Sequence, residues 1–131
     1  MCIRIRSPIH FAIPLSLFRR YGTAFPAIAA AIAPHMSGKT ASTVDVGCGH
    51  GFLVEAWRDA GYTSSYGVEG SPEAASMWPA KHKEEFYTVQ DLTTGDYELP
   101  KTDYVTSFEV AEHLAPQHAD RFVKVRTLSN Q

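Results

Sequence analysis

The chain has 131 residues, of which 44% are hydrophobic and 20% charged, which is typical of one soluble globular domain. The formal net charge of −2 argues against a general nucleic-acid-binding protein, which is usually strongly basic. The longest apolar stretch, Phe25–Pro34, is too short to span a bilayer, and Cys2 and Cys48 do not form a disulfide framework. A reducing compartment, the cytoplasm, is the expected location.

The first 44 residues contain no acidic side chain, so the chain begins with a basic segment. Two arginines precede an apolar run over residues 11–18, as they would in a targeting peptide, but Pro14 interrupts this run and two more arginines follow it. The alternative is an irregular arm that packs on the domain or covers its ligand. We therefore divide the chain into an N-terminal arm and helix over residues 1–40 and a ligand-binding domain over residues 41–131.

Apolar periodicity and turn residues predict the elements in chain order. They are a helix over 24–36, a strand over 43–46, a helix over 52–60, a strand over 64–69, a helix from Ser71 to near Trp78, strands over 86–90 and 103–108, and a helix from Pro116. Trp57 and Phe122 fit core positions of their helices. This alternation predicts an α/β fold with a parallel sheet covered by helices. The link between the third and fourth strands shows no helical pattern, so it holds a short helical turn or an extended crossover.

Three glycines on alternate positions, Gly47, Gly49 and Gly51, follow the first strand and precede a helix. Glycine adopts backbone angles that other residues avoid, and a ligand can lie directly against its main chain. Ligands of α/β sheets bind outside the carboxyl ends of the strands, where this turn lies. Cys48 is interpreted as a small turn residue rather than a nucleophile, and His50 as facing solvent. The turn therefore predicts a nucleotide-like ligand.

Acidic residues stand at the ends of the predicted strands. Asp45 could hold an ammonium group, Glu69 could accept both hydroxyls of a ribose, and Asp91 could accept from an exocyclic amine. A dinucleotide site fits less well, because it requires glycine where Phe52 stands and because Asp45 would face a pyrophosphate. A ligand that combines a ribose, an adenine and an amino acid fits better, and a nicotinamide-dependent oxidoreductase is the less favoured alternative.

Four ordered segments carry a family resemblance: Val44–Gly51, Tyr66–Ser71, Gln90–Leu92 and Asp103–Leu114. They resemble the motifs of class I S-adenosylmethionine-dependent methyltransferases, and the last resembles the subgroup that includes ubiquinone-biosynthesis O-methyltransferases. The resemblance implies a Rossmann-like parallel sheet with helices on both faces, S-adenosylmethionine as cofactor, and methyl transfer to a small-molecule acceptor. The implied cofactor-binding residues are Asp45, Gly47, Cys48, Gly49, Gly51, Glu69, Gly70, Asp91, Leu92, Phe108 and Glu109.

The residues after the fourth strand leave several interpretations open. If this segment were helical, Glu109 and His113 would share a face with Glu112 beside them. Such a group could bind a divalent metal, and small-RNA 3′-end methyltransferases use a similar group completed by a distant histidine. The later histidine here, His118, is too close to match, so we expect no metal. His113 is the candidate catalytic residue, as a general base toward an acceptor hydroxyl, and a structural hydrogen bond is the alternative.

The full sheet of this family has seven strands, whereas four are predicted here, followed by one helix. A truncated or frame-shifted product is favoured, and a fragment of a longer protein or a minimal form are the alternatives. The fourth strand would be an open edge that a partner or residues 1–40 could cover. Much of the acceptor pocket in this family comes from the missing half. An inactive cofactor-binding or regulatory remnant is therefore the second hypothesis, and no oligomeric state is predicted.

Overall fold

The computed structural model describes residues 2–4, 24–94 and 97–123. Most of the N-terminal segment that resembles a targeting peptide lies outside these ranges. The helices and strands in chain order are β1 (Cys2–Arg4), α1 (Ala24–Ile32), a 3₁₀ helix (Ala33–His35), β2 (Thr43–Val46), α2 (Phe52–Asp59), β3 (Ser65–Glu69), α3 (Pro72–Ala75), α4 (Lys83–Phe86), β4 (Tyr87–Val89), β5 (Tyr104–Thr106), a 3₁₀ helix (Ala111–His113) and α5 (Pro116–Val123). All four predicted strands are present. No helix in the described ranges is long and apolar enough to cross a membrane.

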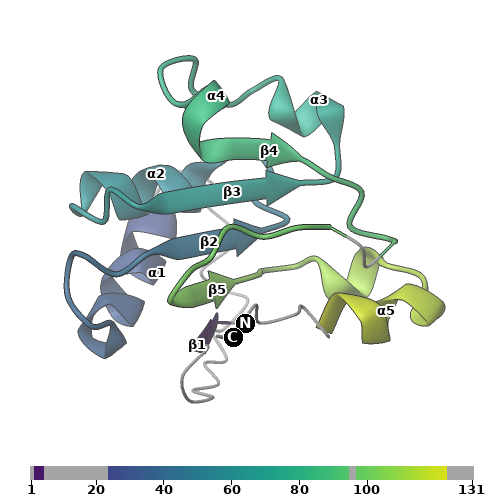
Figure 1. Cartoon of the computed structure of the whole chain (residues 1–131), viewed down its shortest axis with the longest axis horizontal. Coiled ribbons are helices and arrows are strands. Elements are labelled where there is room, and N and C mark those ends of the chain that lie inside the picture. Colours follow the sequence, from purple (N-terminus) through teal and green to yellow (C-terminus); the bar gives the residue numbers. More distant parts are fainter. Residues whose placement is uncertain (1, 5–23, 95–96, 124–131) are drawn as a thin grey trace.

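The strands in the described residues form one sheet in the order β1-β5-β2-β3-β4 (Figure 1). Strands β2 to β5 are parallel, with Val44 of β2 opposite both Tyr66 of β3 and Val105 of β5. Their carboxyl ends point to the same side of the molecule (Figure 1). The predicted parallel α/β sheet is therefore confirmed, as a partial Rossmann-like fold.

Strand β1 pairs antiparallel with β5, with Ile3 opposite Val105. It lies along the edge that we expected a partner or residues 1–40 to cover, so the chain itself supplies this covering strand. The sequence did not indicate it, because three residues are too few to show a period.

The helices pack on the two faces of the sheet through separate apolar clusters. On one face α1 packs on α2, in a buried cluster of Ile28, Ala29, Ile32, Leu53, Ala56, Trp57 and Tyr62. On the other face Phe122 of α5 and Leu92 pack against the valines of β2, β3 and β5. Because side chains alternate along a strand, Val44 and Val46 face α5, whereas Thr43 and Asp45 face α1 and α2. The predicted core positions of Trp57 and Phe122 are confirmed.

The crossover from β4 to β5 contains no helix within residues 90–94 and 97–103, so the extended alternative is correct there. The Gln90 side chain closes this loop with two hydrogen bonds to the main chain of Glu98. Its Nε2 donates to the carbonyl oxygen and its Oε1 accepts from the amide, both at 2.7 Å. The crossover brings Leu92 back over the sheet near the ends of β2 and β3.

The predicted helix from Ser71 to near Trp78 is wrong in extent. Ser71 does cap α3, since its Oγ accepts from the Ala74 amide at 3.2 Å, but α3 ends at Ala75 and a separate short helix, α4, follows. The segment after β5, for which a shared helix face was considered, is not a continuous helix. Glu109 has a φ of 55°, and only a 3₁₀ turn over Ala111–His113 follows. Glu109 and His113 therefore do not share one helix face.

Candidate functional site

The glycine turn after β2 is held against the end of β3. The amides of Gly47 and Cys48 both donate to the carbonyl oxygen of Val68, at 2.7 and 3.1 Å. Gly47, Gly49 and Gly51 have φ values of 76°, 54° and 83°, all in the region that favours glycine. A Cβ on Gly47 would lie 2.2 Å from a methyl carbon of Val110. Position 47 therefore requires glycine, both because of its positive φ and because Val110 leaves no space for a Cβ.

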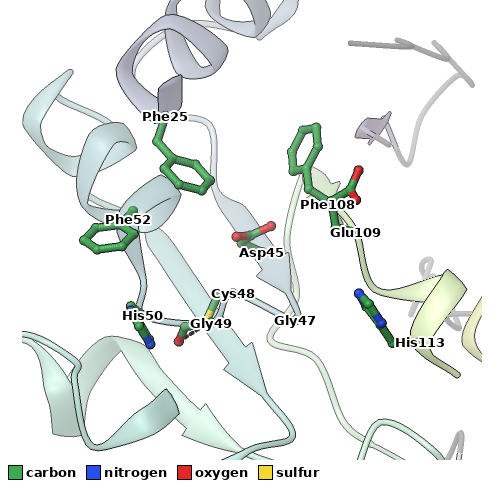
Figure 2. A pocket seen from close by; sticks show the side chains of 10 residues that line it. All are labelled: Phe25, Asp45, Gly47, Cys48, Gly49, His50, Phe52, Phe108, Glu109 and His113. Carbon is green, nitrogen blue, oxygen red and sulfur yellow. Dashed lines mark hydrogen bonds between the residues drawn. The ribbon is translucent and has the colours of Figure 1, made fainter. Parts of the chain in front are cut away.

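A first cavity of about 330 Å³ opens on the α1/α2 side of this turn (Figure 2). Its lining combines the turn with three phenylalanine rings and with acidic and histidine side chains: Phe25, Asp45, Gly47, Cys48, Gly49, His50, Phe52, Phe108, Glu109 and His113. In Figure 2 the rings of Phe25 and Phe108 stand on either side of the Asp45 carboxylate. The cavity is thus apolar at its walls and acidic at its base.

Asp45 is a buried carboxylate at the base of this first cavity. It is 5% exposed, and its Oδ1 accepts from the hydroxyl of Thr106 on β5 at 2.8 Å. Burial raises the pKa of Asp45 from 3.8 to about 7, and the Thr106 hydrogen bond only partly opposes this. A ligand that brings a positive charge to this carboxylate would offset the cost of burying it.

A second cavity of about 320 Å³ lies on the other side of the turn, where β3 and β4 end. It is lined by Gly47, Glu69, Gly70, Asp91, Leu92, Thr93, Glu109, Val110, His113 and Leu114. Both cavities include Gly47, Glu109 and His113, so they meet at these residues and form one groove in two halves. One half contains Asp45, and the other contains Glu69 and Asp91.

Glu69 connects the end of β3 to the glycine turn. Its Oε2 accepts from the Gly49 amide at 2.7 Å, and its Oε1 accepts from the Ser71 amide at 2.8 Å. Each carboxylate oxygen can accept more than one hydrogen bond, so both can still receive a ligand hydroxyl. Glu69 is thus oriented by the main chain toward the second cavity.

Asp91 is an exposed carboxylate at the far end of the second cavity. Its Oδ1 accepts from the amide and the hydroxyl of Thr93, at 2.8 and 2.6 Å, and these bonds lower its pKa. Oδ2 remains a second acceptor on the same carboxylate. Leu92 beside it is buried and packs against the valine cluster, so it offers an apolar surface next to a polar acceptor.

Glu109, Glu112 and His113 form a polar group where the two cavities meet. A hydrogen bond with the Glu112 carboxyl and repulsion from it raise the pKa of Glu109. The pKa of Glu112 is lowered, first by a hydrogen bond from the main chain of Glu112 and then by the one with Glu109. His113 lines both cavities. In the part of the chain that the structure describes, no group of three or more potential ligands is arranged to hold a metal ion.

A family model described as a methyltransferase domain matches residues 17–124, most of the chain. The chain belongs to this family of methyltransferase domains. The predicted family is thus confirmed, and the match covers both halves of the groove. Comparison with curated proteins finds no match.

Three solved structures that resemble this domain are described as methyltransferases. The amino pentose methyltransferase CalS10 from Micromonospora echinaspora, solved with SAM bound, has a TM-score of 0.59 and 21% identity, over 89% of this chain and 51% of its own. The sugar N-methyltransferase KedS8 from Streptoalloteichus sp. has a TM-score of 0.58 and 22% identity, over 91% and 51%. The methyltransferase domain of bacterial CtHen1-CN has a TM-score of 0.56 and 19% identity, over 77% and 56%. These likenesses show the fold, and this chain spans about half the length of those proteins.

The methyltransferase domain brings together nearly all of the residues singled out from its sequence. Of these, Gly51 lines neither cavity; its Cβ position lies 2.7 Å from the Tyr87 ring, behind the turn. Phe25, His50 and Phe52 line the first cavity but were not predicted as site residues. Phe52 could have been predicted as a lining residue, because it directly follows the glycine motif. No local sequence feature indicates that Phe25 on α1 lines the cavity. His50 is exposed as expected, yet its ring packs edge-on against Phe52 at 5.7 Å.

Proposed function

We propose that this chain binds S-adenosylmethionine along the two-part groove and transfers its methyl group to a small acceptor molecule. The observation that carries the proposal is that the cavity containing Asp45 and the cavity containing Glu69 and Asp91 meet at Gly47. An amino acid and a nucleoside joined through one sulfur require two such halves in contact. The family match supports the activity, and the SAM-bound state of CalS10 supports the cofactor.

In this proposal each half of the groove holds one half of the cofactor. Asp45 and the Gly47–Gly51 turn hold the methionine part, with the buried carboxylate paired to its ammonium group. Glu69 and Gly70 hold the ribose, and Asp91 and Leu92 hold the adenine. When bound, the cofactor supplies a methyl group on a positively charged sulfur. Glu109 lies where the halves meet and Phe108 lies beside it in the first cavity, so both would flank that sulfur.

The lining of the first cavity favours an uncharged or amine-bearing acceptor. The described lining residues include no lysine or arginine, and Asp45 is already paired with the cofactor in this proposal, so an anionic acceptor would find no cationic partner and would face the Glu109 carboxylate. Phe25 and Phe52, whose ring centroids are 5.8 Å apart, offer an apolar wall to the acceptor. His113 is the proposed general base, which accepts the proton of the attacking group. Most of the acceleration comes from holding acceptor and methyl group in line.

Thermal unfolding with and without S-adenosylhomocysteine tests the cofactor assignment. A ligand that binds only the folded chain adds about 2.7 kcal/mol at 100 times its dissociation constant, so the melting temperature should rise clearly. Glu69→Gln should weaken this response, because an amide group would face the Gly49 and Ser71 amides. Glu73→Gln is the matched control, since Glu73 is exposed and lines neither cavity. A folded parent chain that does not respond would refute the assignment.

Two alternatives are separated by further measurements. An inactive cofactor-binding remnant would bind S-adenosylhomocysteine. It would, however, produce no S-adenosylhomocysteine when incubated with S-adenosylmethionine and a panel of small amines and alcohols. A nicotinamide-dependent oxidoreductase would bind NAD in preference to S-adenosylhomocysteine. The buried Asp45 disfavours NAD, because the pyrophosphate would lie beside a carboxylate.

A further inference from the structure

Trp78 and Tyr87 form an aromatic pair behind the glycine turn. Their rings stack with centroids 4.9 Å apart and an interplanar angle of 24°, and both side chains are buried. They pack with Cys48 of the turn and with Val54 of α2. Neither ring lines either cavity, so this pair reaches the turn from a side that the proposed ligand does not.

Polar atoms of this pair reach the main chain of the turn. The Trp78 Nε1 donates to the carbonyl oxygen of Gly49 at 2.8 Å. The Tyr87 hydroxyl lies 2.7 Å from Glu55 Oε1 and 3.3 Å from the Gly51 carbonyl oxygen, and its single hydrogen favours the shorter bond. His82 Nδ1 contacts the same Glu55 carboxylate at 2.9 Å. Gly49 is therefore held at both ends, its amide by Glu69 and its carbonyl by Trp78.

Two glycines, Gly51 and Gly67, make space for the Tyr87 ring because they carry no side chain. A Cβ on Gly67, which pairs with Tyr87 across the sheet, would lie 2.7 Å from both the Tyr87 ring and the Cys48 sulfur. A Cβ on Gly51 would lie 2.7 Å from the same ring. Any side chain at either position would push the ring away from the turn.

We infer that Trp78 and Tyr87 are positioning residues: Trp78 fixes the orientation of the Gly49 carbonyl, and the Tyr87 ring packs against Gly51, so that the turn is ready to receive the cofactor. The inference rests on the proposed function for the identity of the ligand. The hydrogen bond from Trp78 orients the Gly49 carbonyl away from the groove. The Gly49 amide is thereby kept on Glu69, whose carboxylate is proposed to bind the ribose.

Substitutions that remove the hydrogen-bond donors of Trp78 and Tyr87 test this inference. Trp78→Phe keeps an aromatic ring but removes the N–H, and Tyr87→Phe removes only the hydroxyl. Trp57→Phe is the matched control, because the buried Trp57 Nε1 has no hydrogen-bond partner among the residues that the structure describes. We expect the Kd for S-adenosylhomocysteine, measured by calorimetry, to rise about tenfold in Trp78→Phe and a few-fold in Tyr87→Phe. In Trp57→Phe it should stay within twofold of the parent, and all three variants should melt within a few degrees of it.

Hydrogen exchange supplies a readout that does not need the ligand. The Gly49 and Gly51 amides should exchange about tenfold faster in Trp78→Phe than in Trp57→Phe. Unchanged affinity and unchanged exchange in Trp78→Phe would overturn the inference, as would equal losses in Trp57→Phe. If the folded parent does not bind S-adenosylhomocysteine, the proposed function fails, and the exchange of these amides still decides whether Trp78 positions the turn.

Discussion

Replacing the buried carboxylate of Asp45 by an amide should stabilise the fold and weaken the site. Asp45→Asn keeps an oxygen that can accept from Thr106, but it removes a negative charge from a side chain that is 5% exposed. Residues that cost stability in the free protein and serve a ligand are typical of functional sites. The sign and the pH dependence of both effects follow from the pKa of Asp45.

The raised pKa of Asp45 sets the size of the stability change expected in Asp45→Asn. Because the pKa of Asp45 is 3.8 in the unfolded chain and about 7 in the folded one, the folded chain binds this proton more tightly. The stability that this group contributes is present below pH 4 and is lost as the pH rises through 7. At pH 8 the ionised parent therefore carries a cost of up to about 4 kcal/mol, which Asp45→Asn removes.

Urea denaturation of parent and variant between pH 5 and 8.5 measures this cost. The free energy of unfolding of Asp45→Asn should exceed that of the parent by an amount that grows by about 1.4 kcal/mol per pH unit and levels off above pH 7. The Kd for S-adenosylhomocysteine at pH 8 should rise about tenfold or more. A stability difference that does not depend on pH would show that Asp45 ionises normally, and would refute this reasoning.

Three further outcomes are expected. Gly47→Ala should lower the free energy of unfolding by about 2 kcal/mol or more in urea denaturation, because of its φ and its contact with Val110, and adding Val110→Ala should recover part of the loss. His113→Gln should reduce kcat about 100-fold in a methyl-transfer assay while the Kd for S-adenosylhomocysteine stays constant; an equal change in both would argue against a general base. Thr106→Val should destabilise the chain by about 1–3 kcal/mol at pH 8 and by less at pH 5, where Asp45 is protonated; equal losses at the two pH values would contradict this.

Local sequence signals were sufficient for the four parallel strands and for the starts of α1, α2, α3 and α5, whereas β1 and α4 were not predicted. Ser71 followed by proline marks the start of α3, and the structure confirms the cap. The early end of α3 could not be predicted, because it accompanies a contact 29 residues away in sequence, from the Trp78 indole to the Gly49 carbonyl. Local patterns contain no information on such a partner.

The segment after β5 shows tertiary contacts overriding helical spacing. Glu109 adopts a φ of 55°, and this bend places Val110 against the bare α-carbon of Gly47. Residues within the recognised motifs could be predicted as site residues because the carboxyl ends of parallel strands converge. Phe25 could not, since only the packing of α1 on α2 brings it to the cavity.

The antiparallel pairing of β1 has a consequence for the order in which the chain assembles. Cys2 pairs with Thr106, so β1 leaves the ribosome well before β5, the strand that it joins. At synthesis rates of roughly 5–20 residues per second, it waits about 5–20 s for its neighbour, while β2 and β3, which are close in sequence, can pair much earlier. A contact between such distant segments is slow to close. Strand β1 is therefore expected to join the sheet late, after β2 and β3 have paired.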